Sequence, residues 1–163
     1  MYRLCWRVLN RLSLFATMMK TPTALNAIQR YLSRQHVFSI FTFHTDDYWP
    51  ATCFYVFDKQ EMSLIFMTEG DSRHGQLMQK NPAIAGTVSA QTKVISKIQG
   101  IQFRGQVIPL YACDADEARH KYCRRFPVAL AAKTPIWKIY LQEIKMVNNT
   151  LGFGSKLYWQ RED

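Results

Sequence analysis

Two hydrophobic spacings recur along this chain and predict its secondary structure. In residues 22–34 apolar side chains recur every three or four positions, which is typical of a helix, and Thr21 and Pro22 suit an N-cap and a first helical residue. Other segments alternate apolar with polar residues or are rich in β-branched and aromatic side chains, which favours strands. We therefore expect strands at residues 36–44, 51–57, 62–68, 83–91, 98–111, 135–147 and 155–160.

Two further helices interrupt the predicted strands. One begins in the turn after the third strand, and the other lies within residues 113–133. In the latter, Asp114 and Glu117 form a capping-box pattern at the amino end. Arg124 and Arg125 place positive charge near the carboxyl end, where the helix dipole favours it. We interpret these charges as helix-end electrostatics rather than as a ligand site.

The connections between the strands predict the fold class. Residues 45–50 and 58–61 are polar and indicate short turns, while Gly100 and Gly105 suit bends or bulges in the strand at 98–111. About seven mostly antiparallel strands of this apolar character need their edges protected, and closure into a barrel does so. The pattern predicts a mainly β fold with helices, a closed or half-closed antiparallel barrel rather than a doubly wound α/β sheet.

Composition narrows the class of protein. The 163 residues suit one domain with a sizeable core, and with 48% hydrophobic and 20% charged residues the chain is neither disordered nor coiled-coil material. The longest apolar runs are too short to cross a bilayer. The cysteines Cys5, Cys53, Cys113 and Cys123 lack zinc-site spacing and the density of a disulfide scaffold. We expect them to be small hydrophobes in a reducing compartment, the cytoplasm.

Positive charge is concentrated at the amino terminus. The net charge is +9, and residues 1–20 contribute +4 of it without any acid, which leaves +5 for the remainder. Residues 1–20 form a basic amphipathic helix pattern, so they suit a membrane-surface anchor or a targeting peptide. Alternatively, translation begins at Met18 or Met19 and the upstream codons do not belong to the gene. In both cases we expect the folded domain to span residues 21–163.

The stretch "FMTEGDSRHGQLMQKNP" combines a strand, an acidic turn and a helix start. Asp71 or Ser72 is the natural N-cap, which leaves Arg73 and His74 in the first helical turn. Cations are disfavoured at that end of a helix unless an anion offsets them. A serine hydroxyl, an arginine fork and unpaired backbone amides suit a phosphate dianion. The alternative is that Glu69 and Asp71 merely neutralise Arg73.

At this point a family resemblance becomes visible. The order strand–"TEGDSRHGQL"–helix–"KNPAIAGTV"–strand, followed by "IQGIQFRGQVIPL", resembles the flavin mononucleotide (FMN) split-barrel superfamily typified by pyridoxamine 5′-phosphate oxidase. In that superfamily a T-x-x-x-S-R-K turn holds the FMN phosphate. The segments "RQHVFSIFTF", "RRFPVA" and "NNTLGFGSKLYW" resemble its YhbP-like branch. The resemblance covers residues 22–161, and residues 1–18 have no counterpart in it.

The resemblance implies these cofactor-binding residues: Thr52, Cys53, Phe54, Thr68, Ser72, Arg73, His74 and Gln102. Ser72 and Arg73 match the phosphate-binding pair, and Thr68 matches the turn threonine near the flavin. The strand at 51–57 is similar to the one that runs beside the isoalloxazine ring. Gln102 matches a glutamine that contacts the flavin from the facing strand.

The chain also departs from the oxidase pattern. His74 stands where the oxidases have lysine, so a permanent cation is replaced by one that is only partly charged at neutral pH. The second strand lacks the arginine that contributes another phosphate contact in the oxidases. The carboxyl-terminal arginine and histidine that recognise pyridoxine substrates have no match in "NNTLGFGSKLYWQRED". The resemblance therefore does not extend to pyridoxamine phosphate oxidation.

Three functions remain open. The first is an FMN-dependent oxidoreductase acting on an unknown small molecule; split barrels hold the flavin between two subunits, so the resemblance also implies a homodimer. The second is a non-catalytic binder of flavin or haem, or a barrel that has lost its cofactor. The third is a nucleic-acid or membrane-surface protein that uses Arg3, Arg7, Arg11, Arg124 and Arg125. We expect no specific nucleic-acid partner because so little of the charge lies on the fold itself.

Overall fold

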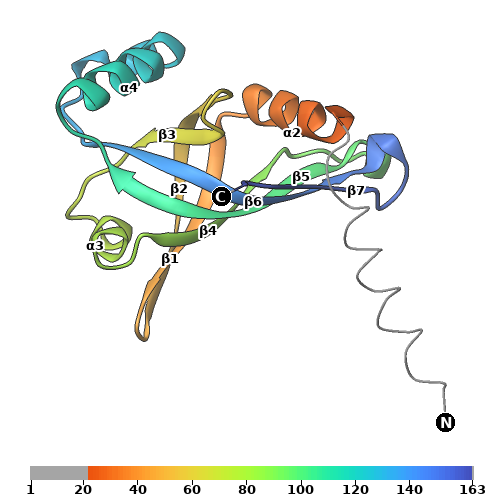
Figure 1. Cartoon of the computed structure of the whole chain (residues 1–163), viewed down its shortest axis with the longest axis horizontal. Helices are drawn as coiled ribbons and strands as arrows, with labels where there is room; N and C mark the ends of the chain where they lie inside the picture. The colour runs from red at the N-terminus through yellow and green to blue at the C-terminus, as the bar shows by residue number, and fades with distance from the viewer. Residues whose placement is uncertain (1–21, 163) are drawn as a thin grey trace.

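A computed structural model describes residues 22–162 as one antiparallel sheet with three α-helices (Figure 1). The helices are α2 (Pro22–Arg34), α3 (Arg73–Lys80) and α4 (Ala112–Arg125). The strands are β1 (Val37–His44), β2 (Asp47–Asp58), β3 (Ser63–Met67), β4 (Ala83–Ser89), β5 (Gln99–Pro109), β6 (Ile136–Asn148) and β7 (Lys156–Gln160). Short 3₁₀ turns lie at η1 (Ile95–Lys97), η2 (Pro127–Ala131) and η3 (Asn149–Leu151). The predicted basic extension, residues 1–20, and the Thr21 cap lie outside the described residues.

The sheet closes on itself. Its strand order is β3-β2-β1-β4-β5-β6-β7, and β3 also pairs with β6, so the strands from β3 to β6 form a closed barrel. Residues 136–140 of β6 pair with β3, whereas residues 143–147 pair with β7. One long strand therefore serves the barrel with its first half and an outer strand with its second half. The prediction of a mainly β, antiparallel barrel with helices is confirmed.

A bulge lies where β6 changes partner. The β5–β6 register shifts between Arg104 and Gly105, and Gln142 is the extra residue. A Cβ atom on Gly105 would lie 2.4 Å from the carbonyl oxygen of Tyr140, so only glycine allows this approach. The predicted bulge at Gly105 is confirmed, while Gly100 pairs with Val147 without a register shift.

The barrel interior, α2 and α3 form the main core, to which α3 contributes Met78. Phe38, Tyr55 and Phe66 are buried in the barrel, and Phe38 contacts both other rings edge-on. Helix α2 covers this core with Ile28 and Leu32, each 0% exposed. Helix α4 instead packs outside the barrel, in a smaller cluster: Ile65, Leu110, Ala118, Tyr122 and Ile136.

Strand β2 begins earlier than predicted. Residues 45–50 were expected to be a turn, but β2 starts at Asp47, which pairs with His44, and the turn is confined to residues 45–46. Thr45 has a φ of 53°, as such a tight turn requires. Pro50 fits within the strand because β3 pairs only with residues 55–58 of β2, so that side of Pro50 needs no backbone donor.

Helix α4 also differs from the prediction. It starts at Ala112 with Tyr111 as an N-cap that makes no side-chain bond, so the predicted capping box of Asp114 and Glu117 is wrong. Glu117 instead pairs with Lys121 one turn later, at 2.9 Å. The helix ends at Arg125, ahead of the predicted segment end, because Pro127 disfavours helical geometry at the residue before it.

Candidate functional site

The amino end of α3 is organised around Ser72. Ser72 is the N-cap: its Oγ accepts a hydrogen bond from the Gly75 N–H (3.2 Å) and donates one to the Glu69 carbonyl (2.7 Å). A Cβ atom on Gly75 would lie 2.4 Å from the same carbonyl, so glycine allows the turn to close this tightly. The backbone N–H groups of Arg73 and His74 have no partner within residues 22–162. They are the free donors that every helix start leaves.

The His74 ring points back to the end of β3. Its Nε2 lies 2.6 Å from the Thr68 hydroxyl and 3.3 Å from the Ser72 Oγ. Thr68 is itself held, because its carbonyl accepts a bond from the Trp137 indole N–H at 3.0 Å. Burial lowers the pKa of His74 below its ordinary value, so the imidazole is neutral at physiological pH. The turn thus presents polar atoms rather than a second permanent cation.

Arg73 is the cation of this turn, and its partner is an acid remote in sequence, Asp47. Its guanidinium donates to Asp47 Oδ1 at 2.5 Å and lies over the Trp49 ring, 4.3 Å from the centroid. The predicted alternative, neutralisation by Glu69 and Asp71, is wrong, since neither pairs with Arg73; Glu69 accepts from the Thr134 hydroxyl instead. Asp47 and Trp49 escaped the sequence interpretation because their segment was expected to be a loop.

A second group of predicted residues lies on the outer face of the sheet. The register places one polar residue from each of five neighbouring strands, β2, β1, β4, β5 and β6, in a lateral row, here called the polar row: Thr52, Ser39, Thr87, Gln102 and Lys145. The hydroxyls of Thr52 and Ser39 are 3.2 Å apart. At the far end of the row a groove of about 230 Å³ is lined by Gln102, Phe103, Arg104, Glu143 and Lys145. Thr52 and Gln102 therefore share a face although they are remote in sequence.

Aromatic side chains continue this outer face along the β1–β2 hairpin. Residues two apart on a strand point the same way, so four exposed side chains share the face of Thr52, and we call them the aromatic patch: Phe41, Phe43, Tyr48 and Phe54. They are 42–63% exposed, and the rings of Phe41 and Tyr48 stack at 5.9 Å. Asp47, which holds Arg73, precedes Thr52 on the same strand by roughly 17 Å of extended chain, and it alternates with the side chains of the aromatic patch.

Cys53 does not share this face. It alternates with Thr52 and Phe54, so its side chain turns inward and packs against the barrel core. Burial raises the pKa of the Cys53 thiol to about 11. Of the residues that the resemblance implies, Cys53 could meet a ligand on the outer face only through its backbone.

No protein-family model matches the chain. Individual proteins do align with it over most of their length. It is 55% identical to a UPF0306 protein of Photorhabdus laumondii over 134 residues, which cover 82% of this chain and 94% of the relative. It is 49% identical to a UPF0306 protein of Yersinia pestis over 144 residues, or 88% of this chain and 97% of the relative. The chain belongs to the UPF0306 family. The narrower YhbP-like assignment stays a prediction.

Solved structures resemble this UPF0306 protein in fold. A haem-binding protein from Mycobacterium smegmatis aligns with a TM-score of 0.72 and 14% identity, over 87% of this chain and 60% of the other. An FAD-binding protein from Mesorhizobium loti aligns with a TM-score of 0.59 and 11% identity, over 72% and 88%. A Listeria innocua protein provisionally assigned as a pyridoxamine 5′-phosphate oxidase aligns with a TM-score of 0.63 and 10% identity, over 76% of this chain and 98% of the other. The predicted split-barrel fold is confirmed.

No helix within residues 22–162 is long and apolar enough to cross a membrane.

Proposed function

We propose that this UPF0306 protein binds FMN as a homodimer and is a flavin-dependent oxidoreductase of a small molecule. One observation carries the proposal: the amino end of α3 gathers two unpaired backbone N–H groups, the Ser72 cap and the Arg73 guanidinium. Unpaired amides at a helix start, together with an arginine fork, suit a phosphate monoester. FMN carries such a phosphate.

Arg73 is available to a phosphate at little cost. Its ion pair with Asp47 is about half exposed at both side chains. Exposed ion pairs contribute roughly 0–1 kcal/mol, so exchanging the Asp47 carboxylate for a dianion is favourable. Because His74 is neutral, it would orient Thr68 and Ser72 rather than supply charge.

The polar row would orient the flavin ring. Thr52 and Gln102 offer hydroxyl and amide groups for the heteroatoms of the ring, and Phe54 offers an apolar surface beside them. When bound, FMN supplies the redox chemistry by accepting and passing on electrons, while the protein binds and orients it. No side chain of this face stands out as a proton donor.

A second copy of the chain would cover the aromatic patch. Monomeric proteins rarely expose a contiguous group of large apolar side chains, and such patches mark interaction sites. Closed two-fold pairing is the commonest way to bury such a patch. A reducing compartment, the cytoplasm, suits the free cysteines Cys53, Cys113 and Cys123.

A non-catalytic role is the second candidate. The fold neighbours include a protein described as haem-binding as well as one described as FAD-binding. Haem is also planar and anionic, so the same outer face suits a carrier of either cofactor. A barrel that has lost its cofactor is the limiting case.

Fluorescence titration tests the proposal directly. We expect FMN to bind the wild-type protein, and Arg73→Ala to weaken binding roughly tenfold, equal to about 1.4 kcal/mol. Arg124→Ala is the matched control, because Arg124 lies on α4 away from the turn and should leave binding unchanged. Bleaching of bound flavin by a reduced nicotinamide cofactor would identify an enzyme. Failure of the folded protein to bind FMN would contradict the proposal, and haem binding in its place would support the carrier.

A further inference from the structure

A hollow separate from the α3 turn lies beside α2. Its volume is about 430 Å³, and it is lined by Asn26, Gln29, Arg30, Ser33, Arg34 and Lys59. All of these except Lys59 belong to α2, and Lys59 comes from the turn between β2 and β3. Helices α2 and α3 lie well apart in the fold (Figure 1). The hollow therefore forms no part of the proposed flavin site.

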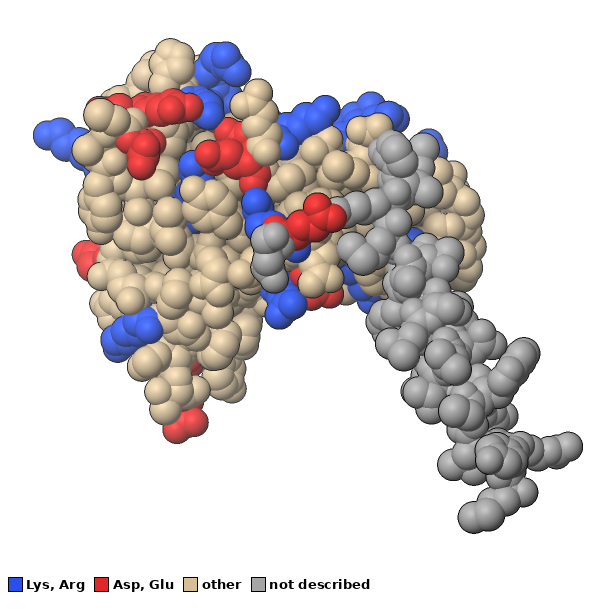
Figure 2. Space-filling model, viewed as in Figure 1, with Lys and Arg blue, Asp and Glu red and all other residues tan. Residues whose placement is uncertain are grey.

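The hollow is strongly positive. Within residues 22–162, Arg30, Arg34 and Lys59 make no hydrogen bond, ion pair or ring contact. Figure 2 shows Lys and Arg side chains along the edge of the molecule that α2 forms. Arg30 and Arg34 are also four residues apart on one helix, a spacing at which like charges repel. An anion between these three cations would remove that repulsion.

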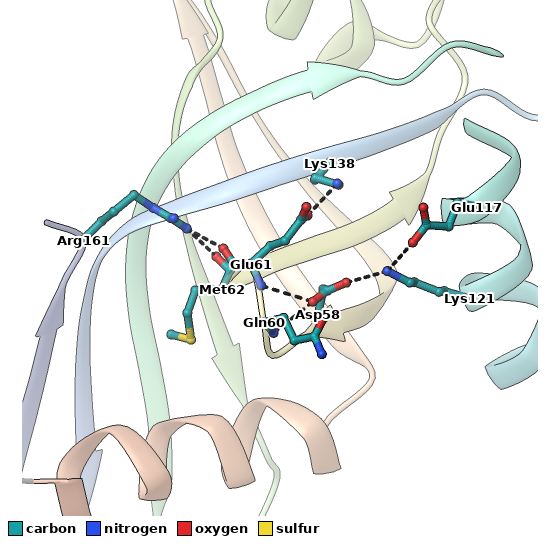
Figure 3. A network of polar contacts seen from close by, with 8 residues as sticks. All are labelled: Asp58, Gln60, Glu61, Met62, Glu117, Lys121, Lys138 and Arg161. Atoms are coloured by element: carbon teal, nitrogen blue, oxygen red, sulfur yellow. Dashed lines mark hydrogen bonds and ion pairs between the residues drawn. The ribbon is translucent and has the colours of Figure 1, made fainter. Parts of the chain in front are cut away.

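The two acids of the turn that carries Lys59 face other cations. Asp58 and Glu61 flank Lys59 in the turn, but Asp58 pairs with Lys121 of α4 at 2.8 Å and Glu61 pairs with Lys138 of β6 at 2.6 Å. Figure 3 shows both carboxylates directed away from α2. The acids of this turn are therefore already neutralised, and within residues 22–162 no carboxylate forms an ion pair with the three cations of the hollow.

The walls of the hollow are held in place. Asp58 Oδ1 accepts from the Gln60 and Glu61 N–H groups at 3.0 and 3.2 Å. The Arg161 guanidinium donates to the carbonyls of Glu61 and Met62 at 2.7 and 3.0 Å (Figure 3). Both sets of bonds fix the turn that carries Lys59, so a ligand would not have to order the backbone.

Helix α2 is fixed as firmly as the turn. Beyond its buried apolar face, carbonyls at its end and just after it accept hydrogen bonds: the Tyr55 hydroxyl donates to Leu32 at 2.8 Å, and the Arg125 guanidinium donates to Ser33 and to Gln35, the residue after the helix, at 3.0 and 2.7 Å. Arg30 and Arg34 therefore extend from a rigid backbone. Asn26 adds an amide without a partner in the described chain.

We propose that this hollow binds a phosphorylated small molecule, with Arg30, Arg34 and Lys59 holding its phosphate groups. Three cations match the charge of a phosphate or a diphosphate, and guanidinium forks bind phosphate oxygens in pairs. The volume falls within the range of small-molecule sites, about 300–1,000 Å³. The Asn26 amide is placed to bond a hydroxyl or carbonyl of the remainder of the ligand.

Calorimetric titration of the full chain with inorganic pyrophosphate tests this site. We expect binding that weakens at least roughly tenfold in the double variant Arg30→Gln, Lys59→Gln. Both residues are exposed, so the variant should keep its fold, which circular dichroism would verify. Arg124→Gln removes an exposed arginine elsewhere and should bind pyrophosphate as the wild type does.

A further variant separates this site from the flavin site. Arg73→Ala should leave pyrophosphate binding intact, and the double variant should leave FMN binding intact. Absence of pyrophosphate binding, equal binding by the double variant, or a loss seen only in Arg73→Ala would each overturn the proposal. Retention of duplex DNA by a protein that does not bind pyrophosphate would overturn it too, in favour of a nucleic-acid surface.

Discussion

At the scale of single residues, the α3 turn depends on close approach rather than on charge. Ser72, Thr68 and His74 are joined by hydrogen bonds of 2.6–3.3 Å, and Gly75 lets the chain pass directly against the Glu69 carbonyl. The turn is therefore formed before any ligand arrives. Its one cation, Arg73, stays half exposed and exchangeable.

Gly75→Ala should destabilise the protein. Alanine normally favours a helix over glycine by about 1 kcal/mol, but here its Cβ would lie 2.4 Å from a backbone oxygen that cannot move alone. We expect a net loss of about 1–3 kcal/mol in the free energy of unfolding, measured by urea denaturation. Gly70→Ala is the matched control, because its Cβ would meet only the flexible end of Gln79 at 3.3 Å. Equal stability of the two variants would show that the turn relaxes freely.

At the scale of elements, the described part of the chain joins α4 to the barrel through an apolar cluster and the Lys121–Asp58 ion pair. Lys121 bridges Asp58, whose side chain is 9% exposed, and Glu117, whose side chain is 71% exposed. Burial alone would raise the pKa of Asp58, but hydrogen bonds from Lys121 and from the turn backbone outweigh it and hold that pKa below its ordinary value. The two acids thus share a cation in different surroundings.

Asp58→Asn should cost stability at neutral pH, by about 1–2 kcal/mol, whereas Glu117→Gln should change little. A carboxyl whose pKa is lowered by folding stabilises the native state above its ordinary pKa and loses that contribution as the pH falls. The ordinary value is 3.8 for Asp58. The free energy of unfolding, measured by urea denaturation at a series of pH values, should therefore fall less steeply with decreasing pH in Asp58→Asn than in the wild type. The same pH dependence of the free energy of unfolding in both proteins would refute the role given to the Asp58–Lys121 pair.

At the scale of the whole molecule, the outer face of the sheet combines the polar row with the aromatic patch. The two adjoin across β1 and β2, so a copy of the chain covering the patch would also lie beside Thr52. Assembly and cofactor binding would then be coupled, since each subunit would supply part of the proposed cofactor site.

Phe41→Asp should therefore convert a dimer into a folded monomer. Phe41 is 43% exposed, so the substitution leaves the core intact while placing a charge in the proposed interface. Light scattering coupled to gel filtration should show half the wild-type mass, and FMN affinity should fall with it. Val128→Asp, at a side chain 91% exposed on η2, should keep the wild-type mass. An unchanged mass in Phe41→Asp would place the interface elsewhere.

Much of the architecture could be predicted from the sequence because it rests on local signals. The spacing of apolar residues marked α2 and the seven strands, and a serine before a glycine-containing first turn marked the start of α3. The predicted start and end of α4 were wrong because competing signals set its position. Asp114 and Glu117 match a cap pattern, but the apolar contacts of Ala118 and Tyr122 set where α4 lies, and Pro127 ends it.

What the sequence by itself determined is the set of elements and the α3 turn, since backbone propensity and side-chain period act within a few residues. Only the tertiary structure decided that Asp47 neutralises Arg73, that Cys53 faces inward, and that Thr52 and Gln102 share a face. These relations depend on strand register, where a shift of one residue turns every side chain to the other face. Register is set by the packing of the whole barrel, which no short stretch of the chain encodes.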